Sequence, residues 1–242
     1  MTANSQLISV KVLQGLVRKG FQPLFNLSRL NLFSSTFNGN LAKRIFDIVF
    51  ALSILTIFSP VYLILIVAIA LNSKGPIFYV QQRVGKDRQP FNCIKFRTMV
   101  DRADTMLETI MEDSPQMRQE FQDTHKLKQD PRITKIGKFL RLTSLDEFPQ
   151  FWNVLKGEMS VVGPRPLVRE ELPKYGRKID TVLTIKPGIT GLWQVSGRND
   201  IPYPKRVQID AYYATSHNWL LDLWIVYKTI GVIVFPKNNG AY

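Results

Sequence analysis

The sequence predicts an α+β fold that is mostly helical, in which a membrane anchor precedes a globular domain. One long apolar segment, residues 45–71, is broken near its middle by Ser59-Pro60. Two short β-like runs flank a polar turn, and the rest of the chain alternates helical patterns with Gly/Pro loops. We therefore expect three parts: an N-terminal extension (residues 1–40), a re-entrant membrane helix (residues 41–73), and a domain on the cytoplasmic side with a small β-hairpin and interfacial amphipathic helices (residues 74–242).

The N-terminal extension is polar, with scattered apolar residues and several basic positions. It does not resemble a cleavable signal, because the apolar run begins too late and lacks a small-residue cleavage site. Two alternatives stay open for it: an amphipathic helix that lies on lipid, or a loose segment.

The apolar segment holds one charged residue, Asp47, in 27 residues. A straight helix of that length would measure roughly 40 Å, which is enough to cross a hydrocarbon core of about 30 Å. Two features oppose a single crossing. Basic residues flank both ends, which places both ends in the cytoplasm. Pro60 cannot donate a hydrogen bond to the carbonyl of Thr56, although the Ser59 hydroxyl can satisfy a freed carbonyl. We favour a helix–break–helix that enters one leaflet and returns, with a Pro-kinked spanning helix as the alternative.

The elements of the third part, residues 74–242, follow in order. Residues 77–80 and 91–96 predict a hairpin around Gly85-Lys86-Asp87. Residues 101–123 predict an acidic helix whose apolar stripe contacts the core. The remaining expectations are a basic helix over residues 134–142, an apolar and aromatic stretch over 145–155, Gly/Pro loops at 161–166 and 186–191, a helix within 201–219, and an interfacial or core-facing stretch over 219–235.

Composition narrows the class of partner. Lys and Arg outnumber Asp and Glu by 32 to 19, a net charge of +13 that favours an anionic partner over a merely solvated basic surface. Nucleic acid is disfavoured, because no helix-turn-helix, zinc spacing or basic low-complexity run is present. The single Cys93 excludes an internal disulfide and fits a reducing compartment, and with only His125 and His217 a Cys/His metal site is disfavoured.

The adjacent carboxylates Asp146 and Glu147 are the first candidate for chemistry. Carboxylates form acyl-phosphate intermediates in some phosphoryl-transfer enzymes, and they also bind Mg²⁺ through oxygen. Successive residues on a helix diverge by about 100°, so the two would have different roles. The alternative is a pair at a helix N-terminus with Ser144 as the cap.

Five basic residues next to tight turns form the second candidate: Lys95, Arg97, Arg141, Arg165 and Arg198. A pyrophosphate needs several fixed positive donors, and Arg supplies bidentate geometry. Prolines on both sides of Arg165 would stiffen its backbone. Each residue alone could be an ordinary surface cation, but five together with a carboxylate pair favour a phosphate site.

At these residues the chain resembles a known family. The matching stretches are Lys43-Arg44-Ile45-Phe46-Asp47, Ser59-Pro60, Gln82-Arg83-Val84-Gly85, Lys95-Phe96-Arg97-Thr98-Met99, Asp130-Pro131-Arg132-Ile133-Thr134, residues 141–147, residues 162–166 and residues 186–198. They resemble the bacterial sugar transferase family, the monotopic phosphoglycosyl transferases, and in particular the undecaprenyl-phosphate hexose-1-phosphate transferase type. The resemblance covers residues 43 to about 235.

The resemblance implies transfer of a sugar 1-phosphate from a UDP-sugar to polyprenyl (undecaprenyl) phosphate with release of UMP, as the initiating step of exopolysaccharide, capsule or O-antigen synthesis. It implies a ping-pong mechanism in which Asp146 is the nucleophile and Glu147 positions metal or substrate, with Mg²⁺ as cofactor held by this pair. Lys95, Arg141, Arg165 and Arg198 match positions around the phosphates, and Ser59 and Pro60 match the break in the membrane helix.

The resemblance further implies a place at the bacterial inner membrane, with the catalytic domain on its cytoplasmic face and lipid as a partner, and it allows a homodimer. Glucose 1-phosphate and galactose 1-phosphate are the leading expectations for the transferred group. Two other functions stay open: a non-catalytic basic module that binds anionic lipid or an assembly partner, and a glycosyltransferase that releases UDP.

Overall fold

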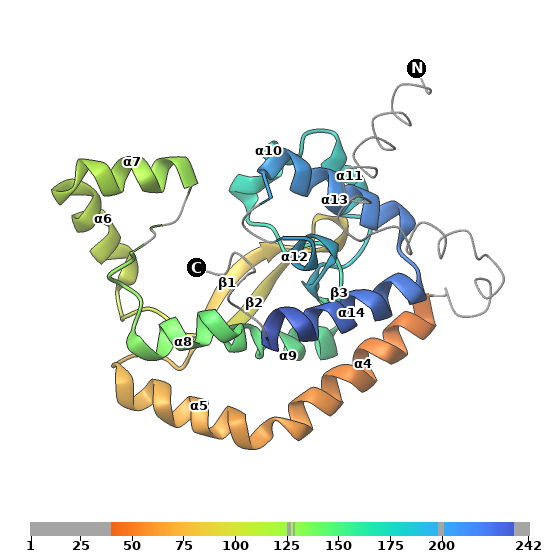
Figure 1. Ribbon diagram of the computed structural model, residues 1–242, viewed down its shortest axis with the longest axis horizontal. Helices are drawn as coiled ribbons and strands as arrows, with labels where there is room; N and C mark the ends of the chain where they lie inside the picture. The colour runs from red at the N-terminus through yellow and green to blue at the C-terminus, as the bar shows by residue number, and fades with distance from the viewer. Residues whose placement is uncertain (1–39, 125–126, 128, 198–200, 235–242) are drawn as a thin grey trace.

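The computed structural model describes residues 40–124, 127, 129–197 and 201–234 and shows a mostly helical α+β fold, as predicted (Figure 1). The elements are α4 (Asn40–Ile57), α5 (Ser59–Asn72), β1 (Phe78–Val84), η3 (Lys86–Arg88), β2 (Pro90–Phe96), α6 (Ala103–Asp113), α7 (Pro115–Thr124), α8 (Lys135–Thr143), η4 (Leu145–Glu147), α9 (Gln150–Lys156), β3 (Ser160–Val162), η5 (Arg169–Glu171), α10 (Leu172–Tyr175), α11 (Lys178–Val182), β4 (Gly188–Thr190), α12 (Leu192–Val195), α13 (Tyr203–Ser216) and α14 (Trp219–Val234). The predicted extension lies outside the described residues apart from Asn40, as do His125 and Arg198.

The apolar segment forms two helices that meet at Phe58 with a bend of 63°. Pro60 lies in the first turn of α5, and the Ser59 hydroxyl donates to the carbonyl of Thr56 at 2.8 Å. This is the carbonyl that Pro60 leaves without a backbone donor. Among the described residues no single helix is long and apolar enough to cross a membrane, and only the bent pair passes by length and composition. The break is therefore where the sequence predicts it.

The start of α4 is bound to the globular domain by side chains. Lys43 forms an ion pair with Asp222 of α14 at 2.5 Å. The Nη1 and Nη2 atoms of Arg44 donate to carbonyls at the end of α9. Asp47 accepts hydrogen bonds from the Ser160 hydroxyl and the Val161 amide, both at 2.9 Å. The basic pair at this flank therefore has partners within the protein, in addition to the topological role that its charge suggests.

The predicted hairpin is present as the antiparallel pair β1–β2. Its register pairs Gln81 with Cys93 and Tyr79 with Lys95. Because side chains alternate along strands and directly paired residues share a face, Arg83, Cys93 and Lys95 lie on one side. Phe96 lies on the other side, in a small core with α5 and α8.

Both predicted Gly/Pro loops contain a short strand, because β3 and β4 pair in parallel at the main core. Gly163, directly after β3, lies against the backbone of β4. An added Cβ at Gly163 would lie 2.6 Å from the Gly188 nitrogen, and one at Gly188 would lie 2.0 Å from the Gly163 nitrogen. This close approach sets the position of the segment that carries Arg165.

The prediction for residues 101–123 is wrong in two respects. The segment is two helices, because Ser114 precedes Pro115 and is extended (φ −130°, ψ 102°), the conformation that a following proline favours. Its apolar stripe does not reach a core cluster. No residue of α6 is buried, and the two helices pack on each other (Figure 1, green, at the left).

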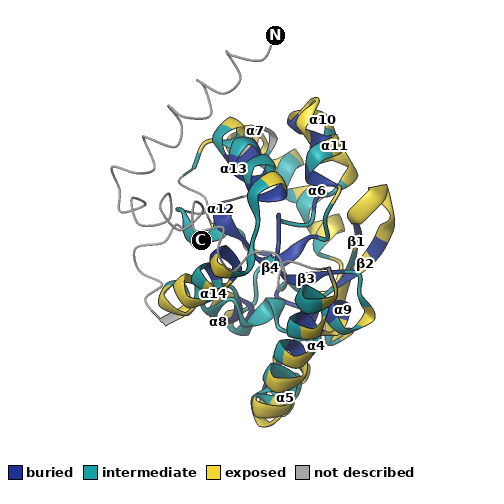
Figure 2. Ribbon diagram, turned by 90° about the vertical axis from the view of Figure 1, so that its right-hand side faces the viewer, coloured by how far each residue is buried: buried dark blue, intermediate teal, exposed yellow. Residues whose placement is uncertain are grey.

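The C-terminal segments agree with the prediction. Residues 201–219 contain α13, and α14 is two-sided: Leu221 and Ile225 are buried, whereas Leu223, Tyr227 and Ile230 are exposed. In both views α8, α9 and α14 lie between the bent pair α4–α5 and the rest of the domain (Figures 1 and 2).

Candidate active site

The carboxylate pair lies in a short connection between two helices. Helix α8 ends at Ser144, which is left-handed (φ 58°) and donates its backbone N–H to carbonyls of the last turn. Asp146 and Glu147 follow in the 3₁₀ turn η4, just before α9. The Ser144 side chain makes no capping hydrogen bond to this turn, so the alternative of a Ser144-capped helix start does not describe it.

Lys95 joins the hairpin to the carboxylate pair. Its ammonium lies 2.7 Å from Glu147 and 3.9 Å from Asp146. Burial raises the pKa of Asp146 to about 6; the cations Lys95 and Arg141 lower it, and the neighbouring Glu147 raises it. Asp146 is thus mostly ionised at neutral pH but poorly solvated, which suits a nucleophile in a site that excludes water.

Arg141 approaches the same carboxylate from α8. Its Nε donates to the Thr98 hydroxyl at 3.0 Å, and the charges of Asp146 and Asp130 both act on its guanidinium. Burial lowers the pKa of Arg141. Helix α8 can reach Thr98 because Gly137 faces it, where a Cβ would lie 1.9 Å from the Thr98 carbonyl oxygen.

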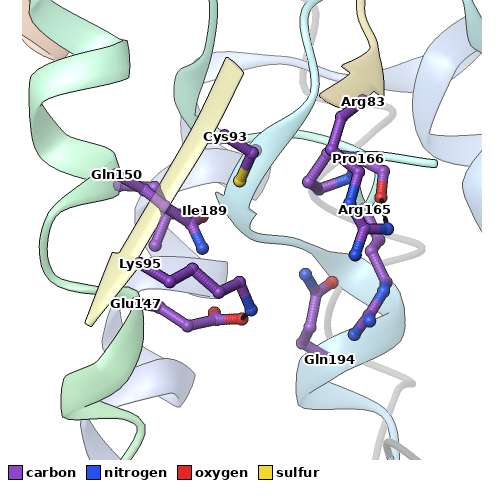
Figure 3. Close-up of a pocket in the computed structure, with 10 residues that line it drawn as sticks. Arg83, Cys93, Lys95, Glu147, Gln150, Arg165, Pro166, Ile189 and Gln194 are labelled. Atoms are coloured by element: carbon purple, nitrogen blue, oxygen red, sulfur yellow. Dashed lines mark hydrogen bonds and ion pairs between the residues drawn. The ribbon is translucent and has the colours of Figure 1, made fainter. Parts of the chain in front are cut away.

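A pocket opens beside Lys95 and Glu147 (Figure 3). Its empty space is about 350 Å³, a volume that includes solvent at the mouth. It is lined by Arg83, Cys93, Lys95, Glu147, Gln150, Arg165, Pro166, Gly188, Ile189 and Gln194. Three cations against one carboxylate make this lining suitable for an anion such as a diphosphate.

Of the five predicted cationic residues, some lie at the pocket and others do not. Lys95 and Arg165 line the pocket, and Arg141 acts on Asp146 from α8. Arg97 does not line it. Its guanidinium donates to the carbonyl of Ser73 at 2.7 Å and to the hydroxyl of the same residue at 3.0 Å. Ser73 directly follows α5. Arg198 lies outside the described residues.

Arg165 stacks on the ring of Trp193, and a second arginine, Arg206, lies against the same ring. The Arg165 guanidinium lies 5.8 Å from the centre of the Trp193 ring, and Arg206 lies 4.5 Å from the same ring. Arg206 is buried and lies near Glu171 and Asp210, and Asp210 accepts from the Tyr175 hydroxyl at 2.7 Å. Burial raises the pKa of Asp210 to about 6. This network supports one wall of the pocket.

Arg83, Gln150 and Gln194 line the pocket but were not predicted site residues. Arg83 is one of the basic residues that follow α5 in the sequence, but its side chain is buried and donates to the Pro166 carbonyl at 3.1 Å. Strand alternation could have found it, because Arg83 shares a face with Lys95. Nothing in the pattern marks the two glutamines.

Asp146 and Glu147 are the candidate protein ligands for Mg²⁺. Within the described part of the chain no three His, Cys, Asp or Glu side chains form a metal cluster. Mg²⁺ is commonly held by one or two carboxylates together with substrate phosphates and water. Asp146 and Glu147 supply the two carboxylates beside a pocket suited to phosphate, so the residues fit a magnesium ion that arrives with its substrate.

Comparison with known proteins gives a consistent result. A family described as "Bacterial sugar transferase" matches residues 38–236. The chain is 50% identical over 202 residues to a protein of Erwinia amylovora named "UDP-galactose-lipid carrier transferase", and the match covers 83% of this chain and 41% of that protein. It is 44% identical over 234 residues to the "Undecaprenyl-phosphate galactose phosphotransferase" of Salmonella typhimurium, covering 91% of this chain and 48% of that protein. It is 43% identical over 204 residues to the "Exopolysaccharide production protein ExoY" of Rhizobium meliloti, covering 84% and 89%.

The match covers different fractions of these relatives because the relatives differ in length. The chain spans less than half of the Erwinia and Salmonella proteins and most of the Rhizobium protein. The matched region contains the bent helix pair α4–α5, the carboxylate pair and the pocket described above.

Proposed function

Because this chain belongs to the bacterial sugar transferase family, we propose that it transfers a sugar 1-phosphate from a UDP-sugar to a polyprenyl phosphate and releases UMP. Undecaprenyl phosphate is the proposed acceptor and a hexose 1-phosphate the proposed group. The names of two relatives, a UDP-galactose-lipid carrier transferase and an undecaprenyl-phosphate galactose phosphotransferase, support this choice. The reaction would start exopolysaccharide, capsule or O-antigen synthesis.

One observation carries the proposal. The Asp146 carboxylate, whose side chain is 14% exposed, lies 3.9 Å from the ammonium of Lys95, and Lys95 lines a pocket together with Arg83 and Arg165. Phosphoryl transfer needs a nucleophile and fixed positive charge around the phosphates, and little else from the protein. A carboxylate whose pKa is raised to about 6 is ionised at neutral pH and is less solvated than a surface Asp.

The proposed mechanism is ping-pong. An oxygen of Asp146 attacks the sugar-bearing phosphorus, the anhydride bond breaks, and UMP leaves with the electron pair of that bond. The phosphosugar is then held on Asp146 as an acyl phosphate. A phosphate oxygen of the lipid attacks the same phosphorus, the bond to Asp146 breaks, and the carboxylate is restored.

The surrounding charges have separate roles in this scheme. Lys95 and Arg165 would hold the two phosphates, and Arg141 would stabilise charge that develops next to Asp146. Glu147, which is held by Lys95, would position the substrate. Mg²⁺, held by Asp146 and Glu147, would offset the negative charge of the transferring phosphates when bound.

The proposed site of action is the cytoplasmic face of the bacterial inner membrane. The bent pair α4–α5 carries exposed apolar residues along its length, shown in yellow in Figure 2. Helices α8, α9 and α14, which lie next to the anchor, add Phe139, Trp152 and Tyr227 to the exposed apolar residues. A re-entrant anchor with interfacial helices would hold Asp146 at the level of the lipid phosphate.

The first test is UMP release by the purified protein in nanodiscs with undecaprenyl phosphate, Mg²⁺ and a panel of UDP-sugars that includes UDP-galactose and UDP-glucose. We expect release with one donor and none from Asp146→Asn. Asp104→Asn, an exposed residue of α6, is the matched control and should keep full activity. UDP as the product would instead establish a glycosyltransferase, and no nucleotide with any donor would favour the non-catalytic lipid-binding module.

A separate test addresses the topology. We expect cysteines introduced at Lys74 and at Thr2 to be labelled from the cytoplasm only, because both ends of a re-entrant anchor lie on one side. Labelling of the Lys74 position from the periplasm would establish a spanning helix and exclude the re-entrant arrangement.

A further inference from the structure

Two glutamine side chains line the pocket. Gln150 is one of them and is 2% exposed. The Oε1 atom of Gln194 is buried and unpaired, and it also lines the pocket. A buried amide without a partner is costly, so a glutamine retained there points to a ligand that completes it.

The two amides come from opposite walls. Gln150 is the first residue of α9, one helical turn after Asp146, and its amide lies on the side of Lys95 and Glu147 (Figure 3). Gln194 belongs to α12, and it points into the pocket from the side of Arg165 (Figure 3). Its Oε1 lies over Gly191, where a Cβ would be only 2.8 Å away.

The chemistry of these groups differs from that of the cations around them. Arg83, Lys95 and Arg165 suit phosphate oxygens, whereas a neutral amide donates through its NH₂ and accepts through its oxygen. Its natural partner is a neutral group that can do the same. In a UDP-sugar three such groups exist: the hydroxyls of the transferred sugar, the hydroxyls of the ribose, and the edge of the uracil.

Two observations favour the sugar. Asp146 would attack the phosphorus that carries the sugar, so the sugar lies next to Asp146 and hence near Gln150, whereas the ribose and the uracil lie beyond the second phosphate. Among the described residues that line the pocket, none has an aromatic side chain on which a base could stack. The Trp193 ring, which lies beside it, is 5% exposed and is covered by two arginines.

We propose that Gln150 and Gln194 bind hydroxyl groups of the transferred sugar and thereby select the donor. This assignment rests on the function proposed above. It names the residues that choose among UDP-sugars, a choice that the charged residues cannot make because every UDP-sugar carries the same two phosphates.

The test uses Gln150→Met and Gln194→Met, which keep side-chain length and remove the polar atoms. Gln82→Met is the matched control, because Gln82 is exposed on the opposite face of the hairpin. We expect kcat/KM for the preferred UDP-sugar to fall about tenfold in each pocket variant. Inhibition by UMP, which has the uracil and the ribose but not the transferred sugar, should stay within twofold, and this also shows that the pocket is intact.

Donors that lack one hydroxyl sharpen the test. With the parent protein, a donor that lacks a bound hydroxyl should have a lower kcat/KM than the complete donor. In the variant that has lost the glutamine for that hydroxyl, the two donors should have the same kcat/KM. Unchanged kcat/KM in both variants overturns the proposal. An equal loss of UMP affinity also overturns it and assigns the amides to the uridine part of the donor, its ribose or its uracil. If the unmodified protein releases no UMP from any donor, the proposed function itself fails, and this result is distinct because it precedes every comparison among variants.

Discussion

At the scale of single residues, the ionisation of Asp146 sets how the site depends on pH. Burial raises the pKa of this carboxyl to about 6, above the usual value of about 3.9. Only the ionised form can attack phosphorus. We therefore expect kcat/KM to rise with pH below about 6, up to tenfold per unit, and to level off above it. A pH profile from 4.5 to about 8 measures this limb.

Lys95 provides the test of that explanation. Its ammonium lowers the pKa of Asp146, so removing it in Lys95→Met should move the acidic limb to higher pH and reduce activity at neutral pH. Lys138→Met, on the exposed side of α8, is the control and should leave the limb in place. A limb that stays fixed in Lys95→Met would mean that another group titrates.

Thr98 is a positioning residue for Arg141. Its hydroxyl accepts from Arg141 Nε at 3.0 Å, and hydrogen bonds to charged donors contribute about 1.5–3 kcal/mol. We expect Thr98→Val to lower kcat about tenfold with a smaller change in KM, because Arg141 would act on developing charge next to Asp146. Thr98→Ser keeps the hydroxyl and should keep most of the activity. Equal kcat values in Val and Ser variants would remove Thr98 from this role.

Residue types explain which site positions were predictable. Adjacent acids and arginines beside Gly/Pro turns are unusual patterns. Glu147, Lys95 and Arg165 do line one pocket, and Asp146 lies 3.9 Å from Lys95. Gln150 was missed because a glutamine at a helix start is ordinary, and only the structure shows that it is buried and lines the pocket. Arg97 looked equivalent to Lys95, but it lies just beyond β2 and bonds to Ser73 instead.

At the scale of elements, helix α4 is tied to both segments that carry the site. Asp47 holds the start of β3, which leads into the Arg165 segment, and Arg44 holds the end of α9, which follows Glu147. We expect Asp47→Ala to destabilise the protein by about 2–3 kcal/mol, because it leaves the Val161 amide and the Ser160 hydroxyl buried and unpaired. Thermal unfolding in detergent measures this loss.

Two matched variants test the cause of that loss. Asp47→Asn keeps an acceptor oxygen and should lose less stability than Asp47→Ala. Ser53→Ala removes only a bond within α4 on an exposed position and should be near neutral. Equal losses in the Ala and Asn variants would show that charge, through Lys43, matters more than the two hydrogen bonds.

Elements with strong local signals were predictable, and those that depend on distant contacts were not. The hairpin and the Ser59-Pro60 break follow from residues within a few positions of each other. The strands β3 and β4 are three residues each and pair across more than twenty intervening positions, so their sequence resembles a loop. The apolar stripe of residues 101–123 had the period of a core helix, but its partner is the adjacent helix.

At the scale of the whole molecule, two different forces could hold this protein to lipid. The net charge of +13 attracts anionic headgroups, whereas the exposed apolar residues of α4 and α5 would be buried in hydrocarbon. Salt separates the two, because the Debye length is only about 3 Å at 1 M ionic strength. If apolar burial dominates, washing membranes with about 1 M NaCl leaves the protein in the pellet, and only detergent extracts it.

A charge variant of the anchor completes that comparison. Leu63 and Ile64 are 65% and 67% exposed on α5, so replacing both with Arg should not disturb the folded core but should make insertion unfavourable. We expect this double variant to appear in the soluble fraction after the same salt wash, while a Lys138→Glu control stays in the pellet. Release of the unmodified protein by salt alone would instead show that the basic surface holds it. The carboxylate pair would then meet lipid phosphate through reversible electrostatic contact, and the bent helix would serve the fold rather than the membrane.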